Sequence, residues 1–257
     1  MIIDAHAHIG EITDFLCFDP SVENLLKRME ELNIDVVINA DYYGLEVPDY
    51  DRGIEKSKYL YKISNKKIVN FFNYNPKHME KCLEVIEKYH DDPAFVGIKI
   101  HPSMHHIFAD DESYRPVWEI AKKYDLPIMS HTWALSDYNP RQKFAVPGLF
   151  EKYIKEYPDV DFIFGHSGGR TEGVREAAAL AAKYANAYLD IAGDPFEYGV
   201  VEYLVNNGGE DKVIYGTDVF WFDFSAQLGM VLGANISDEA KEKIFSKNAL
   251  KVFKRLA

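Results

Sequence analysis

Eight short apolar segments recur along the 257-residue chain, and stretches with a helical pattern separate them. Each segment is rich in β-branched or aromatic residues, and its apolar positions are nearly continuous. This pattern is typical of parallel strands that are buried on both faces. The predicted strands cover residues 2–9, 35–41, 67–75, 95–102, 126–132, 161–169, 187–193 and 212–218.

The segments between the strands predict amphipathic helices. Over residues 21–33, Ser21 is suited to cap a helix, and Leu25, Leu26, Met29 and Leu32 recur on one face. A similar pattern runs over residues 150–157. Residues 237–257 are expected to form one closing helix with an acidic first turn.

Eight strands that alternate with helices predict an α/β fold of the (β/α)8 TIM-barrel class. Parallel strands need crossover helices, and eight tilted strands can close without a free edge. A doubly wound open sheet is the competing arrangement. No linker, low-complexity tract or repeat divides the chain, so residues 1–257 are interpreted as a single barrel domain.

Composition narrows the choice of partners and compartment. With 29 basic and 41 acidic side chains, the formal net charge is −12, which disfavours nucleic acid and anionic membranes as partners. Cys17 and Cys82 have no metal-like spacing, and no apolar run is long enough to span a membrane. We therefore expect a cytoplasmic protein with a small-molecule substrate, and the sequence leaves a homo-oligomer open.

The histidines concentrate at the carboxyl ends of the predicted strands, where TIM barrels carry their chemistry. The residues concerned are His6 and His8 on the first strand, His101, His131 and His166 at the ends of the fourth, fifth and sixth, and Asp218 at the end of the eighth. This placement predicts that they converge on one rim.

A divalent metal site is the chemistry that these residue types favour. His6 and His8 are two residues apart on a strand, so both side chains point to one face, about 6.6 Å apart along it. With His131 and Asp218 they would form a nitrogen and oxygen shell suited to zinc, with manganese, iron or nickel also compatible. His166 could be a further ligand or hold a metal-bound water, and Asp218 could move protons. Asp4 could orient a ligand or belong to a turn.

Several other residues are candidates for substrate contact. Lys99, His101, Arg141 and Arg170 lie on or just beyond strand ends, where one or two could bind a carboxylate, and Trp133 with residues 220–222 could wall a pocket. We retain His101, Lys99, Trp133 and Arg170 as substrate-binding candidates. His105 and His106 are expected to be solvated or to line the substrate site.

The stretch GHSGG at residues 165–169 also fits the nucleophile elbow of α/β-hydrolases, with Ser167 as the nucleophile. Those enzymes place the triad histidine after the serine. No histidine follows His166 in the chain, so Ser167 is interpreted as a turn residue.

An ordered set of motifs resembles the amidohydrolase superfamily, in its amidohydrolase-related (amidohydrolase 2) branch. The motifs are DAHAH (4–8), GIKIHP (97–102), SHT (130–132), GHSGG (165–169), YGTD (215–218) and KNA (247–249). In mononuclear members the resemblance implies His6, His8, His131 and Asp218 as ligands, with His166 beside the activated water or substrate. In dinuclear members it implies a second ion at His131 and His166, bridged by a carboxylated lysine for which Lys99 is the candidate. One ion, zinc, is favoured here.

Three functions are consistent with this reading. The first is a metal-dependent hydrolase of a small, carboxylated amide, lactone or ester, in which metal-bound hydroxide attacks, Asp218 is the general base and His166 stabilises charge. The alternative is a metal-dependent non-oxidative decarboxylase of an aromatic or semi-aromatic acid, because the branch also resembles such enzymes. The third is a metal-stabilised binding protein without catalysis.

Overall fold

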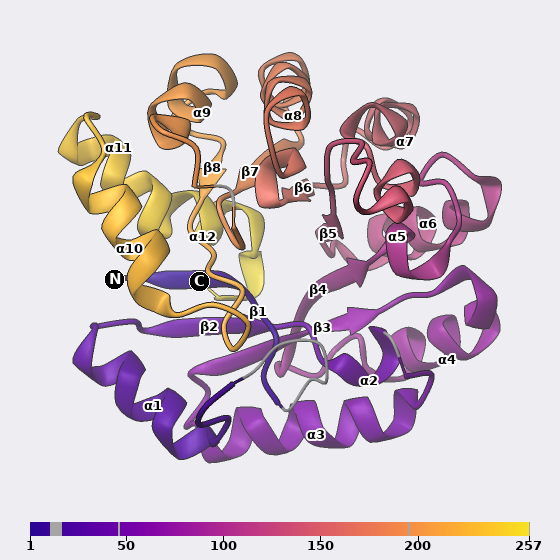
Figure 1. Cartoon of the computed structure of the whole chain (residues 1–257). Coiled ribbons are helices and arrows are strands. Elements are labelled where there is room, and N and C mark those ends of the chain that lie inside the picture. The colour runs from indigo at the N-terminus through magenta and orange to yellow at the C-terminus, as the bar shows by residue number, and fades with distance from the viewer. Residues whose placement is uncertain (11–16, 46, 195, 257) are drawn as a thin grey trace.

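The chain forms a (β/α)8 barrel in the computed structural model, which describes residues 1–10, 17–45, 47–194 and 196–256 (Figure 1). The parallel strands follow one another in chain order around one sheet: β1 (Ile3–Ala7), β2 (Val36–Asn39), β3 (Ile68–Asn73), β4 (Phe95–Ile100), β5 (Ile128–His131), β6 (Phe162–Gly165), β7 (Ala187–Asp190) and β8 (Val213–Ile214). The chain after β8 closes the barrel against β1, since Ala5 donates its N–H to Tyr215 O over 3.0 Å and Ala7 bridges Val219. This consecutive order confirms the TIM barrel and excludes the doubly wound sheet.

Helices surround the strands on the outside (Figure 1). The α-helices are α1 (Val22–Glu31), α2 (Tyr42–Leu45), α3 (Tyr50–Ile63), α4 (Met79–Tyr89), α5 (Pro102–His105), α6 (Arg115–Tyr124), α7 (Glu151–Glu156), α8 (Glu172–Lys183), α9 (Val200–Gly208), α10 (Phe224–Gly233), α11 (Asp238–Glu242) and α12 (Asn248–Val252). Shorter helical turns are η1 (Pro76–His78), η2 (Glu112–Tyr114), η3 (Pro140–Phe144), η4 (Pro147–Phe150), η5 (His166–Gly168), η6 (Lys243–Lys247) and η7 (Lys254–Leu256). Ser21 caps α1 as predicted, accepting the N–H of Asn24.

All eight predicted strands are present, and each is shorter than the apolar segment suggested. The sixth ends at Gly165 because His166 and Ser167 take positive φ angles of 63° and 47°, which a strand cannot contain. The eighth keeps only two residues in regular pairing. The apolar pattern therefore locates each strand, whereas the turn that brings the next side chains onto the rim sets where it ends.

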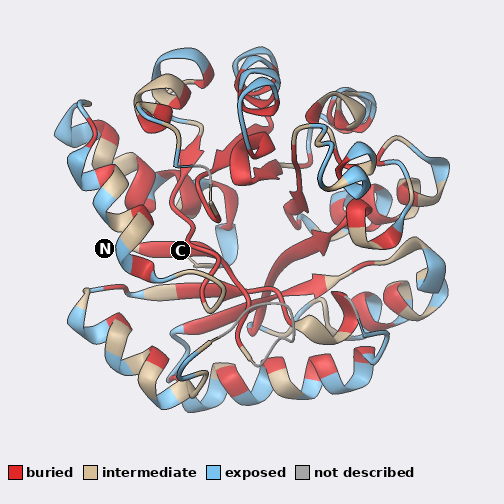
Figure 2. Cartoon of the chain, in the orientation of Figure 1, coloured by how far each residue is buried: buried red, intermediate tan, exposed pale blue. Residues whose placement is uncertain are grey.

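Two apolar layers stabilise the barrel. One fills its interior and includes Ile3, Phe71, Met129 and Ile163. The larger layer lies between the strands and the helices, which is why the strands and the inward faces of the helices are buried in Figure 2. Because both faces of each strand are covered, the near-continuous apolar runs of the sequence follow directly.

The predicted closing helix over residues 237–257 is present but ends early. Ser237 caps it, accepting the N–H of Ala240 over 3.1 Å, and the helix runs from α11 through the π-helical turn η6 into α12, which ends at Val252; Ala257 lies outside the described residues. Val252 and Phe253 join the apolar layer inside the barrel. Because Phe253 turns inward against Phe71, with ring centroids 5.8 Å apart, the helix cannot continue along the outside.

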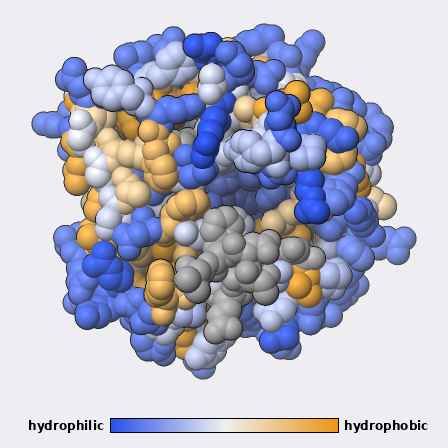
Figure 3. Space-filling view, in the orientation of Figure 1, coloured by the Kyte–Doolittle hydropathy of each residue, from blue (hydrophilic) through white to orange (hydrophobic). Residues whose placement is uncertain are grey.

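The face seen in Figure 3 is largely hydrophilic, with apolar side chains in separate groups. Among the residues that the structure describes, no helix is long and apolar enough to cross a membrane.

Candidate metal centre

A cluster of seven polar side chains lies at the carboxyl ends of the strands, as the barrel geometry requires. They are His6 in β1, His8 just after it, Lys99 in β4, His131 at the end of β5, His166 after β6, Asp190 at the end of β7 and Asp218 after β8. Each is at most 9% exposed. Burying so many polar groups costs free energy unless each has a partner, so their contacts are informative.

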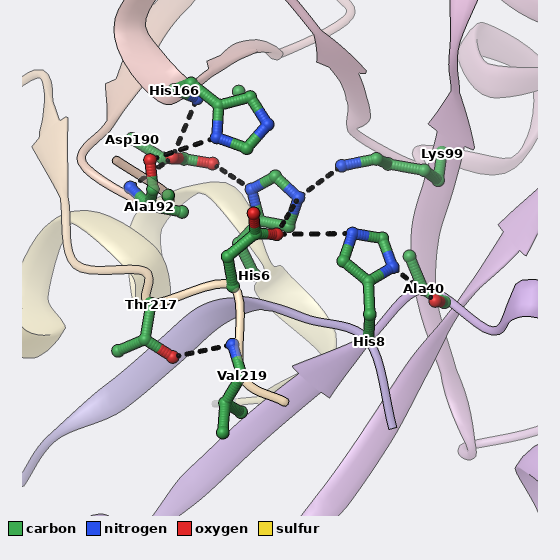
Figure 4. A network of polar contacts seen from close by, with 12 residues as sticks. His6, His8, Ala40, Lys99, His166, Asp190, Ala192, Thr217 and Val219 are labelled. Atoms are coloured by element: carbon green, nitrogen blue, oxygen red, sulfur yellow. Dashed lines mark hydrogen bonds and ion pairs between the residues drawn. The ribbon is translucent and has the colours of Figure 1, made fainter. Parts of the chain in front are cut away.

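The donor atoms of His6, His8 and Asp218 all lie within 4.8 Å of one another. Figure 4 shows the rings of His6 and His8 side by side in this site. Asp218 Oδ1 lies 3.5 Å from His6 Nε2 and 3.3 Å from His8 Nε2. Ligands about 2.1 Å from a tetrahedral ion lie about 3.4 Å apart, so this spacing suits a divalent ion. Asp218 Oδ1 is also buried without a hydrogen-bond partner among the described residues, as expected of an atom that binds an ion.

Asp190 belongs to the candidate site, and the sequence reasoning missed it. Its Oδ2 accepts a hydrogen bond from His6 Nδ1 over 2.7 Å, and its Oδ1 accepts the N–H groups of His166 and Ala192. His6, His166 and Asp190 form a second group of close ligand atoms. A carboxylate behind a histidine is the usual support of a metal ligand. The signal in the sequence was a lone carboxylate within an otherwise apolar segment (187–193), and the structure ends β7 at this residue.

His131 lies beside His166 rather than in either three-ligand group of the described residues. Its ring centroid is 4.9 Å from that of His166, and its Nε2 is 2.9 Å from Gln142 Oε1. Gln142 was also missed, and nothing in the sequence marks it, because it lies in a loop turn without recognisable spacing.

Lys99 is buried inside the cluster, with its Nζ 2.5 Å from His6 Nε2. Burial lowers the pKa of Lys99 to about 8, against the opposing charges of Asp190 and Asp218. The amine therefore occupies the lone pair that His6 would offer to an ion. Carboxylation of Lys99 and a second ion stay predictions.

Burial also sets the charge of the ligands. It lowers the pKa of His8 and brings the pKa values of His6 and His131 well below the usual range, so these imidazoles are neutral and keep a lone pair. Burial alone would raise the pKa of Asp218, but His6 and His166 outweigh it and hold that pKa below the ordinary value. The site thus combines neutral nitrogen donors with an ionised carboxylate.

Aromatic rings flank this cluster on two sides. Trp221 stacks on His8 with centroids 4.3 Å apart, and Trp133 lies edge-on to His166 at 5.5 Å. His101 stacks on His131 at 4.1 Å.

The two arginine candidates lie farther out. Arg170 is exposed, forms an ion pair with Asp194 and lines an open groove of about 660 Å³ beside Trp133. Arg141 is also exposed. A substrate carboxylate would have to compete with Asp194 for Arg170.

Three other expectations have clear outcomes. His105 is not solvated: it is buried, and its Nδ1 is 2.7 Å from the Tyr114 hydroxyl, whereas His106 is exposed. Asp4 holds the rim together, accepting the N–H of Thr217 over 3.0 Å. Ser167 donates its hydroxyl to Asp190 O within a turn, so it is no free nucleophile.

A TIM barrel with buried His and Asp donors converging on one rim defines the class of metal-dependent barrel enzymes. Within that class, the family described as Amidohydrolase matches residues 60–255, and the chain belongs to this family. It is therefore an enzyme of the amidohydrolase superfamily. No curated protein matches the sequence.

Solved structures share the fold at low identity. A 2,6-dihydroxybenzoate decarboxylase from Rhizobium has a TM-score of 0.77 and 16% identity, over 100% of this chain and 99% of its own. A dihydroxybenzoic acid decarboxylase from Polaromonas, with bound manganese, has a TM-score of 0.75 and 15% identity, over 100% and 97%. A 4-oxalomesaconate hydratase from Rhodopseudomonas palustris has a TM-score of 0.74 and 17% identity, over 100% and 96%.

Proposed function

We propose that the protein is a metal-dependent decarboxylase that releases carbon dioxide from a small aromatic carboxylic acid without oxidising it. The observation that carries this proposal is the His6, His8 and Asp218 set, which is spaced for one ion and flanked by flat ring faces. The decarboxylases among the similar structures support this reading better than hydrolysis, which becomes the second candidate.

His6, His8 and Asp218 would hold the ion, His131 would complete the ligand set, and His166 would lie beside it. The bound ion would supply positive charge that binds the substrate carboxylate and draws electron density from the ring. Manganese is held by similar decarboxylases, so it joins zinc as a candidate. Trp221 and Trp133 offer faces against which a planar ring could pack.

The reaction needs one proton. The bond between the ring carbon and the carboxylate breaks, carbon dioxide leaves, and a proton takes the place of the carboxylate on the ring carbon. We assign this transfer to Asp218, which lies within the cluster. Because neighbouring histidines hold the pKa of Asp218 low, it is ionised at rest and must first take up a proton from water or substrate.

A turnover assay with 2,6-dihydroxybenzoate and 5-carboxyvanillate as probes tests the function. Protein loaded with manganese or zinc should release carbon dioxide without net addition of water. At saturating metal, Asp218→Asn should lower turnover by roughly 100-fold or more. The matched variant Asp223→Asn, at an exposed carboxylate in the same loop, should not.

Four results would contradict the proposal. Hydrolysis of amides, lactones or esters without decarboxylation would favour the hydrolase, and metal binding without turnover of any of these compounds would favour a binding protein. A protein purified without chelator that contains no transition metal would refute the metal site itself, as would unchanged metal content after His6→Ala with His8→Ala.

A further inference from the structure

Each histidine of the cluster has one ring nitrogen held by an acceptor. The three Nδ1 contacts are His6 to Asp190 Oδ2 at 2.7 Å, His8 to Ala40 O at 2.9 Å and His166 to Ala192 O at 3.0 Å. An ionised carboxylate or a carbonyl oxygen only accepts, so Nδ1 must carry the proton in all three. These rings therefore keep the lone pair on Nε2.

In His131 the ring nitrogen held by an acceptor is Nε2 instead of Nδ1. Its Nε2 is 2.9 Å from Gln142 Oε1, which also accepts a hydrogen bond from Ser103 Oγ over 2.9 Å. Gln142 and Ser103 are both buried, at 8% and 5% exposure, so neither contact competes with bulk water. With the proton on Nε2, Nδ1 is the ring nitrogen of His131 that is left to bind an ion.

Stacking fixes the plane of the same ring. The His101 ring is inclined by 8° to that of His131, with centroids 4.1 Å apart, and the Trp133 ring is inclined by 2°, at 5.9 Å. A ring held by aromatic neighbours turns with difficulty about its χ2 angle. The hydrogen bond to Gln142 thus has a defined direction.

We propose that Gln142 is a positioning residue that fixes His131 as the Nε2–H tautomer, so that His131 binds the ion through Nδ1 while His6, His8 and His166 offer Nε2. This inference rests on the metal centre of the proposed function. It assigns a role to a loop residue that touches neither ion nor substrate.

Nitrogen NMR of metal-free protein labelled with ¹⁵N-histidine tests the tautomer directly. His131→Gln identifies the His131 signals, and the parent should show a protonated Nε2. Gln142→Glu, whose carboxylate is an acceptor only, should keep this tautomer, whereas Gln142→Leu should lose it. A protonated Nδ1 in the parent would overturn the proposal, because the amide nitrogen of Gln142 would then be the group that faces His131.

Metal affinity provides the second readout. Gln142→Leu should weaken binding of Mn²⁺ and Zn²⁺ roughly 10- to 100-fold, and Gln142→Glu should recover most of it. Asn186→Ala is the matched control. Asn186 is a buried amide that directly precedes β7, at the end of the strand away from the cluster, and its side chain donates to Ile154 O, Tyr157 O and Val160 O. It should lower stability and leave the tautomer and the affinity unchanged.

The outcomes are separable from those of the enzymatic assay. If Gln142→Leu leaves both tautomer and affinity unchanged, or if Gln142→Glu fails to rescue them, the positioning role is wrong. If Gln142→Leu does not fold, the tautomer of the parent protein still decides. Because the spectrum is recorded without metal or substrate, absence of decarboxylation would count against the proposed function alone.

Discussion

Replacing Asp190 by asparagine is the sharpest perturbation of the site, because it changes one buried atom behind a metal ligand. The amide keeps an oxygen that can accept the N–H groups of His166 and Ala192. It places an NH₂ group, however, opposite the protonated Nδ1 of His6, where Asp190 Oδ2 now lies at 2.7 Å. Two donors then face each other.

His6 can relieve this conflict in only one way without leaving its position. It moves its proton from Nδ1 to Nε2, where Lys99 must then accept it as a neutral amine, and Nε2 can no longer bind an ion. Loss of such a support typically weakens metal binding roughly 10- to 100-fold, which corresponds to about 1.4–2.7 kcal/mol. The chain should still fold, because the amide is of similar size and replaces a buried carboxyl whose pKa burial already raises.

Competition with a chelator of known affinity measures the effect for Mn²⁺ and Zn²⁺. Asp41→Asn is the matched control, since Asp41 is similarly buried just after β2 but pairs with Lys56, and among the described residues its side chain makes no hydrogen bond to a histidine ring. The reasoning is refuted if Asp190→Asn binds metal within twofold of the parent protein, or if Asp41→Asn weakens binding as much.

Two further variants test the packing and the electrostatics around the rim. Gly169→Ala should destabilise the protein by about 1–3 kcal/mol in urea unfolding, because φ is +77° there and a Cβ would lie 2.4 Å from the Trp133 ring. Gly229→Ala, which has open space around it, should not destabilise the protein. Equal stabilities of the two variants would contradict this reasoning. Burial lowers the pKa of His105 to about 3 from its usual 6.5, so the unfolded chain binds more protons below pH 6.5 and stability falls on acidification. The free energy lost between pH 7 and pH 5 should be about 2 kcal/mol smaller in His105→Gln, and an unchanged pH dependence would refute the assignment.

The fold could be predicted from the sequence because strands that are buried on both faces appear as local, nearly continuous apolar runs. Eight apolar runs with helical patterns between them admit few topologies, and the barrel is the one that buries every run. The end of the final helix at Val252 could not be predicted. It depends on Phe253 turning into the barrel against Phe71, a contact that the helical pattern of residues 237–257 cannot reveal.

The candidate ligands were found by a rule of position, namely that polar residues at the carboxyl ends of barrel strands face one rim. The rule places His6, His8 and Asp218 together without any knowledge of their neighbours. It did not select Asp190, because the predicted seventh strand ran to residue 193 and placed this carboxylate inside the strand, whereas β7 ends at Asp190.

The rule of position cannot predict which ring nitrogen of each histidine carries the proton. Whether a ring offers Nδ1 or Nε2 depends on a partner far away in the chain: Asp190 is 184 residues from His6, and Lys99, which contacts the opposite nitrogen of the same ring, is 93 residues away. Both ring nitrogens of His6 have a partner, since Asp190 accepts the proton of Nδ1 and Lys99 donates to the lone pair on Nε2. An ion that binds His6 must therefore displace Lys99. Because burial lowers the pKa of that amine to about 8, Lys99 loses its proton at mildly alkaline pH, where giving up the contact costs less than it does for a charged lysine.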